Sequence, residues 1–381
     1  MRALWIVERF PPQKGGVARA AGRQVAALAG ELERLDVLQL SSELPPGRLE
    51  VEDFHAASLH RLGRAPRDEE SLRLLLQVGL ELGRAAGSQL VHGFYATHAG
   101  HVAALLGRWL ERPSAVSLRG NDVELGMFQG SRAAPLRFAL ESATVLLGVS
   151  REILDAVRAW TGRCSGLHFV PNGVDAELFC PGEVSGGVLE ELGGAPRPWL
   201  GFSGQLRFKK GLSVLLELAE GLAARDAGTL FAIGGGRSDE RETLLRWRAA
   251  RPAASRRLLE LPYRDDPVRL VSLYRAMDLM LFPSLWDGMP NALLEAMACG
   301  RPVVAAAAGG IRDAVADGET GILVPLTQLD QFPEVVERVL AQPGPALAAL
   351  GRRAREHVRE HLPAAAELTA TLEVYRSLLA A

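Results

Sequence analysis

Residues 283–325 read PSLWDGMPNALLEAMACGRPVVAAAAGGIRDAVADGETGILVP. The acid Asp287 is followed by a Gly-Met-Pro-Asn turn, and a second acid, Glu295, lies eight positions after the first. The apolar residues 279–282 before the turn predict a buried parallel strand. Residues 291–299 predict a helix, because Pro290 stands near its first turn and Gly300 follows its end. A buried strand that feeds a helix through a short turn indicates an α/β fold.

The turn in this stretch has the features of an anion-binding site. It lies at the carboxyl end of a strand and leads into a helix N-terminus, which offers backbone N–H groups and a positive dipole end. Glu295, one turn into the helix, can accept hydrogen bonds from sugar hydroxyls. The alternative is that Glu295 only complements the helix dipole and that Asp287 only caps the turn.

The same stretch resembles the donor-binding signature of the retaining glycosyltransferases of family 4, which have the two-domain GT-B fold. In that family an acid, seven residues and a Glu close on the sugar nucleotide, and Asp287 through Glu295 repeat this spacing. Residues 309–325 also resemble the family pattern. The resemblance implies that a nucleoside-diphosphate sugar binds here as co-substrate and that Asp287 is a catalytic residue. The residues it implies for donor binding are Gly288, Met289, Pro290, Asn291 and Glu295.

The arrangement of predicted elements indicates two domains. A chain of 381 residues is long enough for two cores. Strands and helices alternate as far as residue 171, and the alternation restarts at residue 199 after a glycine- and proline-rich stretch, residues 181–198. We therefore expect two Rossmann-like α/β domains that face a cleft, residues 1–180 and 196–360. The resemblance implies that the last helix, within residues 364–381, crosses back to the first domain.

Lysine is rare in this chain, and its positions favour phosphate contacts. Only Lys14, Lys209 and Lys210 are lysines among the 43 basic residues. A diphosphate in a cleft needs cations, although chance retention on solvated loops is the alternative. Residues 204–211, GQLRFKKG, resemble the family's Gly-Arg-Leu-x-x-x-Lys-Gly loop, which makes Lys210 a catalytic and phosphate-contacting residue. Gln205 replaces the family arginine, and Arg207 is the candidate for the missing charge.

Two more positions are assigned to the donor site. The run IGGG, residues 233–236, ends a predicted strand, and in this context Gly235 resembles the family's second glycine turn near the donor. Arg264 follows the next strand, where the family holds the nucleotide base, and a guanidinium can stack on a base. A tight turn for the glycines and a solvated arginine for Arg264 are the structural alternatives.

The first domain is expected to hold the acceptor and to contribute Arg119 to catalysis. Its candidates are the Gly15-Gly16 loop, the strand-end His92, and Arg119 in the segment SLRGND, residues 117–122. The resembling family keeps a sugar-contacting histidine at the Arg119 position, and an arginine there can orient donor or acceptor electrostatically. The alternatives are a strand-end histidine bonded to the backbone for His92 and a structural ion pair with Asp122 for Arg119.

Composition argues against several other classes. The net charge is −2, and residues 1–180 hold 20 basic and 20 acidic residues, so no nucleic-acid partner and at most peripheral membrane contact are expected. His98 and His101 lack a third ligand nearby, and no Asp-x-Asp tripeptide occurs, so we expect no metal and no cofactor beyond the donor. Three cysteines without a CxxC pair and no visible signal sequence favour the cytoplasm.

Together these features predict a retaining, metal-independent glycosyltransferase, in a setting such as polysaccharide biosynthesis. Its acceptor would be a glycan, a lipid-linked molecule or a small molecule. One alternative is an epimerase or phosphorylase of the same architecture. Another is a sugar-binding protein of the periplasmic type, which the missing export signal and the lysine-containing loop disfavour.

Overall fold

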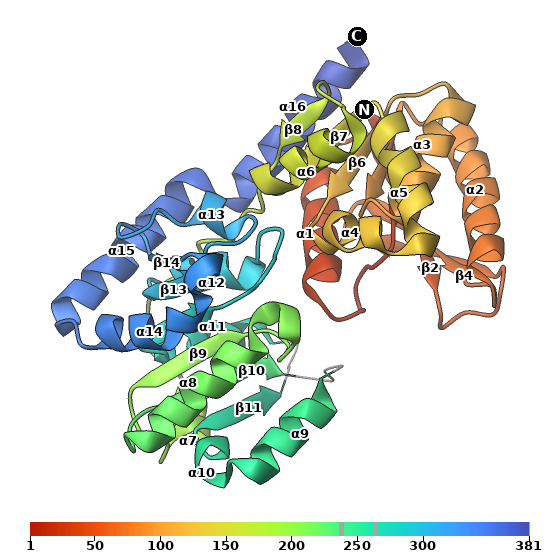
Figure 1. The fold of residues 1–381 in the computed structure, drawn as a ribbon. Helices are drawn as coiled ribbons and strands as arrows, with labels where there is room; N and C mark the ends of the chain where they lie inside the picture. Colours follow the sequence, from red (N-terminus) through yellow and green to blue (C-terminus); the bar gives the residue numbers. More distant parts are fainter. Residues whose placement is uncertain (236–239, 263–265, 381) are drawn as a thin grey trace. The chain divides into compact units, whose positions relative to one another are not determined.

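The structure is a computed structural model that describes residues 1–235, 240–262 and 266–380. The chain divides into two units, Met1–Pro171 with Glu367–Ala381, and Asn172–Ala366. Each unit contains one sheet of mainly parallel strands with helices packed on it (Figure 1). The α/β fold class expected from the sequence is confirmed.

The sheet of the first unit contains eight strands within the described residues, in the order β3-β4-β2-β1-β5-β6-β7-β8. All neighbouring strands are parallel except β3 and β4, which are antiparallel. The strands are β1 (Arg2–Val7), β2 (Arg34–Ser41), β3 (Leu49–Phe54), β4 (Ala57–Gly63), β5 (Leu90–Phe94), β6 (Ser114–Leu118), β7 (Val145–Gly148) and β8 (Leu167–Phe169).

Helices cover both faces of this sheet, and β1 shows why. Successive side chains of a strand point to opposite faces. Trp5 and its alternate neighbours pack in one buried cluster with residues of the first and last helices, while Leu4 and Ile6 pack in another. The helical elements are α1 (Gly16–Ala29), α2 (Asp68–Ala85), α3 (His98–Leu110), α4 (Asn121–Glu124), η1 (Gly126–Phe128), α5 (Gly130–Ser142), α6 (Arg151–Thr161) and α16 (Ala364–Ala380).

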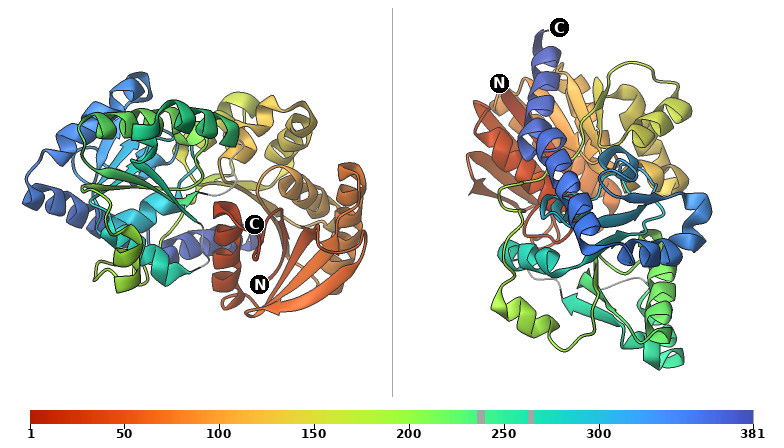
Figure 2. Two further views of the ribbon diagram at one scale, coloured as in Figure 1. Left: turned by 90° about the horizontal axis from the view of Figure 1, so that it is seen from below. Right: turned by 90° about the vertical axis from the view of Figure 1, so that its left-hand side faces the viewer.

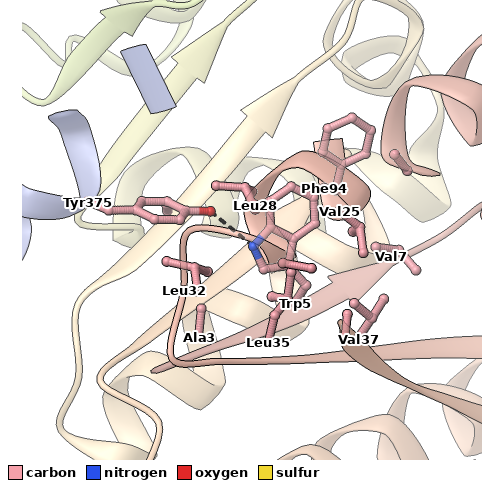
Figure 3. Close-up of a cluster of buried hydrophobic side chains, with 14 of the residues drawn as sticks. Ala3, Trp5, Val7, Val25, Leu28, Leu32, Leu35, Val37, Phe94 and Tyr375 are labelled. Atoms are coloured by element: carbon pink, nitrogen blue, oxygen red, sulfur yellow. Dashed lines mark hydrogen bonds between the residues drawn. The ribbon is translucent and has the colours of Figure 1, made fainter. Parts of the chain in front are cut away.

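The last helix, α16, completes the core of the first unit. Tyr375 is fully buried, and its hydroxyl accepts a hydrogen bond of 3.0 Å from the indole Nε1–H of Trp5 (Figure 3). The same hydroxyl is bonded to His92 Nδ1, and the other ring nitrogen of His92 lies 2.8 Å from Ser117 Oγ. The buried polar groups of three strands and α16 thus satisfy one another.

The sheet of the second unit has the order β11-β10-β9-β12-β13-β14 within the described residues, and its neighbouring strands are parallel. Helices lie on both faces of it (Figure 2). The strands are β9 (Trp199–Ser203), β10 (Thr229–Gly235), β11 (Leu258–Pro262), β12 (Leu279–Phe282), β13 (Val303–Ala306) and β14 (Ile322–Val324). The helical elements are α7 (Gly186–Leu192), η2 (Phe208–Lys210), α8 (Leu212–Ala224), α9 (Arg241–Ala250), α10 (Pro252–Ser255), α11 (Pro267–Ala276), α12 (Asn291–Ala298), α13 (Ile311–Ala314), η3 (Leu326–Gln331), α14 (Phe332–Leu340) and α15 (Gly344–His361).

The glycine- and proline-rich segment 181–198 lies in the second unit. It contains α7, which packs against α11. The backbone N–H of Ser185 donates to Ser272 Oγ at 2.8 Å, and Arg269 pairs with Glu191 at 2.7 Å. The passage from the first unit to the second therefore precedes this segment, at residues 171 and 172.

Both sheets have the same topological feature at their centre. In each, the first strand has neighbours on two sides: β1 lies between β2 and β5, and β9 lies between β10 and β12. Where the strand order reverses in this way, the loops that follow two adjacent strands run in opposite directions. A crevice then opens between these loops at the carboxyl ends of the strands. Ligands of open parallel sheets bind at this position, so the loops after β1, β5, β9 and β12 are the first candidates for functional loops.

We predict that Tyr375→Phe destabilises the first unit by about 1–3 kcal/mol, because Trp5 and His92 then each lose a partner while buried. The control is Ser377→Ala on the exposed face of α16, which should stay within about 0.5 kcal/mol. Urea unfolding gives the free energy of unfolding of each variant, and hydrogen exchange of the β1 and β5 amides reports the stability of the first unit. Equal stability of the two variants would show that the buried network does not contribute.

Candidate active site

Two loops of the second unit meet at the carboxyl ends of β9 and β12. The first is residues 204–211 after β9, and the second is residues 283–290 after β12; we call the end of the second, residues 287–290, the donor turn. The backbone N–H of Leu285 donates to the carbonyl oxygen of Lys209 at 2.8 Å, which joins the loops. The lysines and the acid that stand out in the sequence are thus brought together by the sheet topology.

Lys210 and Asp287 form an ion pair across these loops. The ammonium of Lys210 donates a hydrogen bond to Asp287 Oδ2. The two side chains are 22% and 15% exposed, so the pair is partly buried and still reachable from solvent. The site therefore contains a compact cation and a carboxylate in contact with each other.

Three glycines allow the surrounding backbone to approach the two loops closely. A Cβ atom at Gly211 would lie 2.1 Å from the carbonyl oxygen of Pro283. A Cβ at Gly309 would lie 1.8 Å from the Asp287 carbonyl oxygen, and one at Gly310 would lie 1.8 Å from that of Gly288. Gly310 N–H also donates to the Asp287 carbonyl at 3.1 Å. Because no side chain fits in these gaps, the donor turn is fixed backbone against backbone.

The donor turn leads directly into α12. Gly288, Met289 and Pro290 are buried, and Pro290 is the N-cap residue of the helix. Pro290 makes no side-chain hydrogen bond to cap this helix end, and the first turn of the helix carries no acidic residue. The first backbone N–H groups of a helix lack partners within it and carry the positive end of its dipole. An anion at this position would be stabilised by both.

Glu295 is held from the sheet side by a residue that the sequence did not reveal. Its side chain is almost completely buried, at 5% exposure. The fully buried Tyr274 of α11 donates its hydroxyl to Glu295 Oε2 at 2.8 Å, and Ser203 Oγ lies 2.9 Å from the same hydroxyl. Tyr274 lies 21 positions before Glu295 on another helix, and no motif marks the pair.

The structure gives less detail for the other residues predicted to bind the donor. Arg207 is half-buried directly before η2, and its carbonyl accepts the N–H groups of Lys210 and Leu212. Gln205, at the family arginine position, is exposed. Gly235 ends β10, whereas Arg264 lies outside the described residues.

In the first unit, Gly15 and Gly16 form an open loop end. Both residues are exposed, and a Cβ at either one would meet nothing within 4 Å. Gly15 has a φ of +129° and precedes α1, whose first turn carries no acidic side chain. This loop follows β1 at the central crevice of the first sheet, where a ligand is expected.

The prediction that His92 faces a cleft is wrong. The residue is 0% exposed within the core of the first unit, and both ring nitrogens are engaged, by Tyr375 and Ser117. Burial lowers the pKa of His92 to about 3, with a smaller effect from the nearby Arg119 charge. His92 is a neutral structural histidine that links β5 to α16.

Arg119 also differs from its prediction as a cleft residue. Its side chain is 5% exposed, lies over the Phe94 ring at 4.7 Å, and pairs with Glu367 of α16 at 3.8 Å. Glu367 in turn accepts hydrogen bonds from Arg23 and Gln24 of α1. Burial lowers the pKa of Arg119 to about 10, partly offset by Glu367, so the group stays cationic at neutral pH. The guanidinium therefore ties β6 to α16.

Asp122, the other acid near Arg119, supports the backbone instead of the guanidinium. Its carboxylate accepts the backbone N–H groups of Ala96 at 2.9 Å and of Arg119 at 3.0 Å. Burial raises the pKa of Asp122 to about 6, against the effect of these two hydrogen bonds. The carboxylate thereby joins the loops that follow β5 and β6.

Metal ligands and membrane spans were sought throughout the described residues. Residues 1–235, 240–262 and 266–380 contain no group of three or more His, Cys, Asp or Glu side chains placed to hold a metal ion. In those same ranges no helix combines the length and the apolar character needed to cross a bilayer.

We predict that Arg119→Met destabilises the first unit by about 3 kcal/mol, near the lower end of the cost of breaking a buried pair, because Glu367 keeps Arg23 and Gln24. Arg137→Met, which breaks an exposed pair with Glu141, should cost less than about 1 kcal/mol. Calorimetric melting compares them. An Arg119→Met protein with normal melting and lost turnover would restore the catalytic assignment.

Known proteins resemble both units of this chain. A family model described as a glycosyl transferase 4-like domain matches residues 15–173, and one described as glycosyl transferases group 1 matches residues 197–342. The chain is 29% identical over 364 residues to the GDP-mannose-dependent alpha-(1-6)-phosphatidylinositol monomannoside mannosyltransferase of Mycolicibacterium smegmatis, covering 91% of each chain. It is 28% identical over 402 residues to the alpha-maltose-1-phosphate synthase of Mycobacterium tuberculosis, covering 100% of each.

The fold has a close counterpart among solved structures. Sucrose-phosphate synthase from Thermosynechococcus elongatus matches with a TM-score of 0.80 and 21% identity, covering 100% of both chains. One glycosyltransferase model lies over each unit, and the matched relatives extend over both. The chain therefore belongs to the family 4-like glycosyltransferases of the GT-B fold.

Proposed function

We propose that this glycosyltransferase moves a sugar from a nucleoside diphosphate to an acceptor hydroxyl, with retained anomeric configuration and without a bound metal ion. The observation that carries the proposal is the contact between Lys210 and Asp287 beside the N-terminus of α12. A cation, a helix end whose N-cap residue is a proline, and a second, buried acid occur together at the central crevice of a parallel sheet. This set fits a ligand that has both a diphosphate and hydroxyl groups.

The diphosphate of the donor is assigned to Lys210 and the first turn of α12. Lys210 supplies a mobile ammonium, and the helix supplies backbone N–H groups with a fixed direction. Negative charge grows on the diphosphate as the bond to the sugar breaks. Donors that are already oriented toward that charge lower the barrier without a metal ion.

Glu295 is assigned to the hydroxyls of the donor ribose, as the resemblance implies. Because Tyr274 donates to one carboxylate oxygen, the rotamer of Glu295 is set by the protein. A carboxylate accepts hydrogen bonds without donating any, so it selects hydroxyl groups. The Glu295 side chain therefore does not have to change its rotamer when the donor binds.

The acceptor is assigned to the first unit, at the open Gly15-Gly16 loop. Its class is left as a glycan, a lipid-linked molecule or a small molecule. The relatives support a sugar-containing acceptor: one is named a phosphatidylinositol monomannoside mannosyltransferase, and another is named for the synthesis of a sugar phosphate, alpha-maltose 1-phosphate. Since His92 and Arg119 are buried, the acceptor is not expected to contact either of their side chains.

We expect Lys210→Ala to weaken binding of a nucleoside diphosphate by about 10- to 150-fold, the equivalent of one charge-assisted hydrogen bond, with much less loss for the free nucleoside. Calorimetry with UDP, GDP and ADP, and with the matching nucleosides, measures this difference. Arg225→Ala, which removes an exposed cation of the same unit, is the control. Equal losses for diphosphate and nucleoside would mean that Lys210 acts through the fold.

We expect Glu295→Gln to lower kcat/KM for the nucleotide sugar by about 10- to 150-fold. The amide keeps an oxygen for the Tyr274 hydroxyl, so the melting temperature should change little. Initial rates at varied donor concentration, with product stereochemistry followed by NMR, test both the residue and the retained configuration. An unchanged kcat/KM would remove Glu295 from the donor site.

A further inference from the structure

Asn172 makes a long-range contact with the donor turn. It is the first residue of the second unit and is 4% exposed. Its side-chain Nδ2 donates a hydrogen bond of 2.6 Å to the carbonyl oxygen of Met289. The two residues are 117 positions apart in the sequence, and both are buried. A buried bond of this kind fixes the carbonyl group that accepts it.

The segment around Asn172 is itself joined to the second passage of the chain between the units. Val174 N–H donates to the Leu362 carbonyl, and Ala364 N–H donates to the Val174 carbonyl, each at 2.9 Å. A Cβ at Gly173 would lie 2.6 Å from the carbonyl oxygen of Pro363, so the two segments touch backbone to backbone. We call residues 172–174 and 362–364 the paired crossing.

The Met289 carbonyl, which accepts the hydrogen bond from Asn172, lies where it can orient α12. The Met289 carbonyl belongs to the peptide bond that precedes Pro290, the N-cap residue. Gly309 and Gly310 pack against the preceding carbonyls, those of Asp287 and Gly288. The Asn172 bond therefore acts on the last peptide before the helix, and it restrains the direction in which the first N–H groups of α12 point.

We propose that Asn172 is a positioning residue of the donor site: through the Met289 carbonyl it fastens the donor turn to the paired crossing. This role rests on the proposed function, because it gives Asn172 an effect on the diphosphate that the turn binds. Asn172 acts through the backbone of the turn and touches no reacting atom. The donor turn and the two chain segments of the paired crossing are then parts of one hydrogen-bonded assembly within the second unit.

Two substitutions separate this role from simple packing. Asn172→Asp keeps the shape and one oxygen but replaces the N–H donor with a second oxygen, which faces the Met289 carbonyl. Asn172→Ala removes the donor and leaves space. If the N–H donor matters, Asp is the worse replacement; if packing matters, Asp is the better one. The control is Thr229→Val at the start of β10. It removes a buried hydroxyl that donates a hydrogen bond of 2.8 Å to the Pro196 carbonyl.

The experiment is calorimetric titration of the full chain with UDP, GDP and ADP, and with the nucleoside of whichever diphosphate binds. We expect Asn172→Ala to raise the diphosphate Kd about tenfold, the equivalent of one buried hydrogen bond, and Asn172→Asp to raise it further. The nucleoside Kd should change less in both variants. Thr229→Val should bind the diphosphate like the wild type even if its melting temperature falls as far.

The outcomes distinguish this inference from the function on which it rests. If the wild type binds none of the three diphosphates, the proposed function and the role of Asn172 both fail. If the wild type binds one and both Asn172 variants bind it equally well, the function stands and the positioning role is overturned. Tighter binding by Asn172→Asp than by Asn172→Ala would also overturn it, since packing would then explain the loss.

Discussion

Contact between backbone segments around the donor turn is the constraint on which the second unit depends. Gly211 brings the 204–211 loop against Pro283, and Gly309 and Gly310 bring a second loop against Asp287 and Gly288, all closer than any Cβ would allow. Backbone contacts of this kind leave little freedom, because each segment is already fixed at both ends by a strand or a helix. The chemical side chains, Lys210, Asp287 and Glu295, then need only short reaches from a rigid frame. Precision at the site thus comes from residues without side chains, and the charged residues supply the chemistry.

The first unit is held by a different kind of constraint, two sets of buried polar groups that are linked to one another. Trp5, His92, Ser117 and Tyr375 form one connected set, while Glu367 joins Arg119 with Arg23 and Gln24. In a low-dielectric interior such sets stabilise only when every member has a partner. Both sets include a residue of α16, the last helix of the chain. The first unit is therefore incomplete without the C-terminal helix, although most of its sequence lies more than 190 residues earlier.

The sequence predicts local features well and the partners of buried residues poorly. The strand 279–282 and the helix 291–299 were expected close to their observed bounds, because apolar runs, prolines and glycines are local signals. The two loops that the contiguous motifs single out do lie together in the structure, while their role in donor binding stays a prediction. His92 was misplaced because β5 continues to Phe94, which puts His92 in the middle of the strand. Arg119 was misplaced because a residue that follows a strand has the same local pattern whether its side chain faces the crevice or the core. Asn172, Tyr274 and Glu367 were missed because their partners lie 117, 21 and about 250–340 positions away.

The pairing of Lys210 with Asp287 bears on how the proposed donor would be received. An isolated ammonium or carboxylate at a partly buried site is unfavourable, and the pair reduces that penalty for both. A diphosphate that takes Lys210 as its partner brings two or more negative charges toward the N-terminus of α12, and it repels Asp287 from the ammonium. The released carboxylate then needs a new hydrogen-bond partner. The hydroxyls of the transferred sugar arrive with the diphosphate and can donate hydrogen bonds to it. In the proposed binding mode, one exchange of partners would bring the cation to the leaving group and the carboxylate to the sugar.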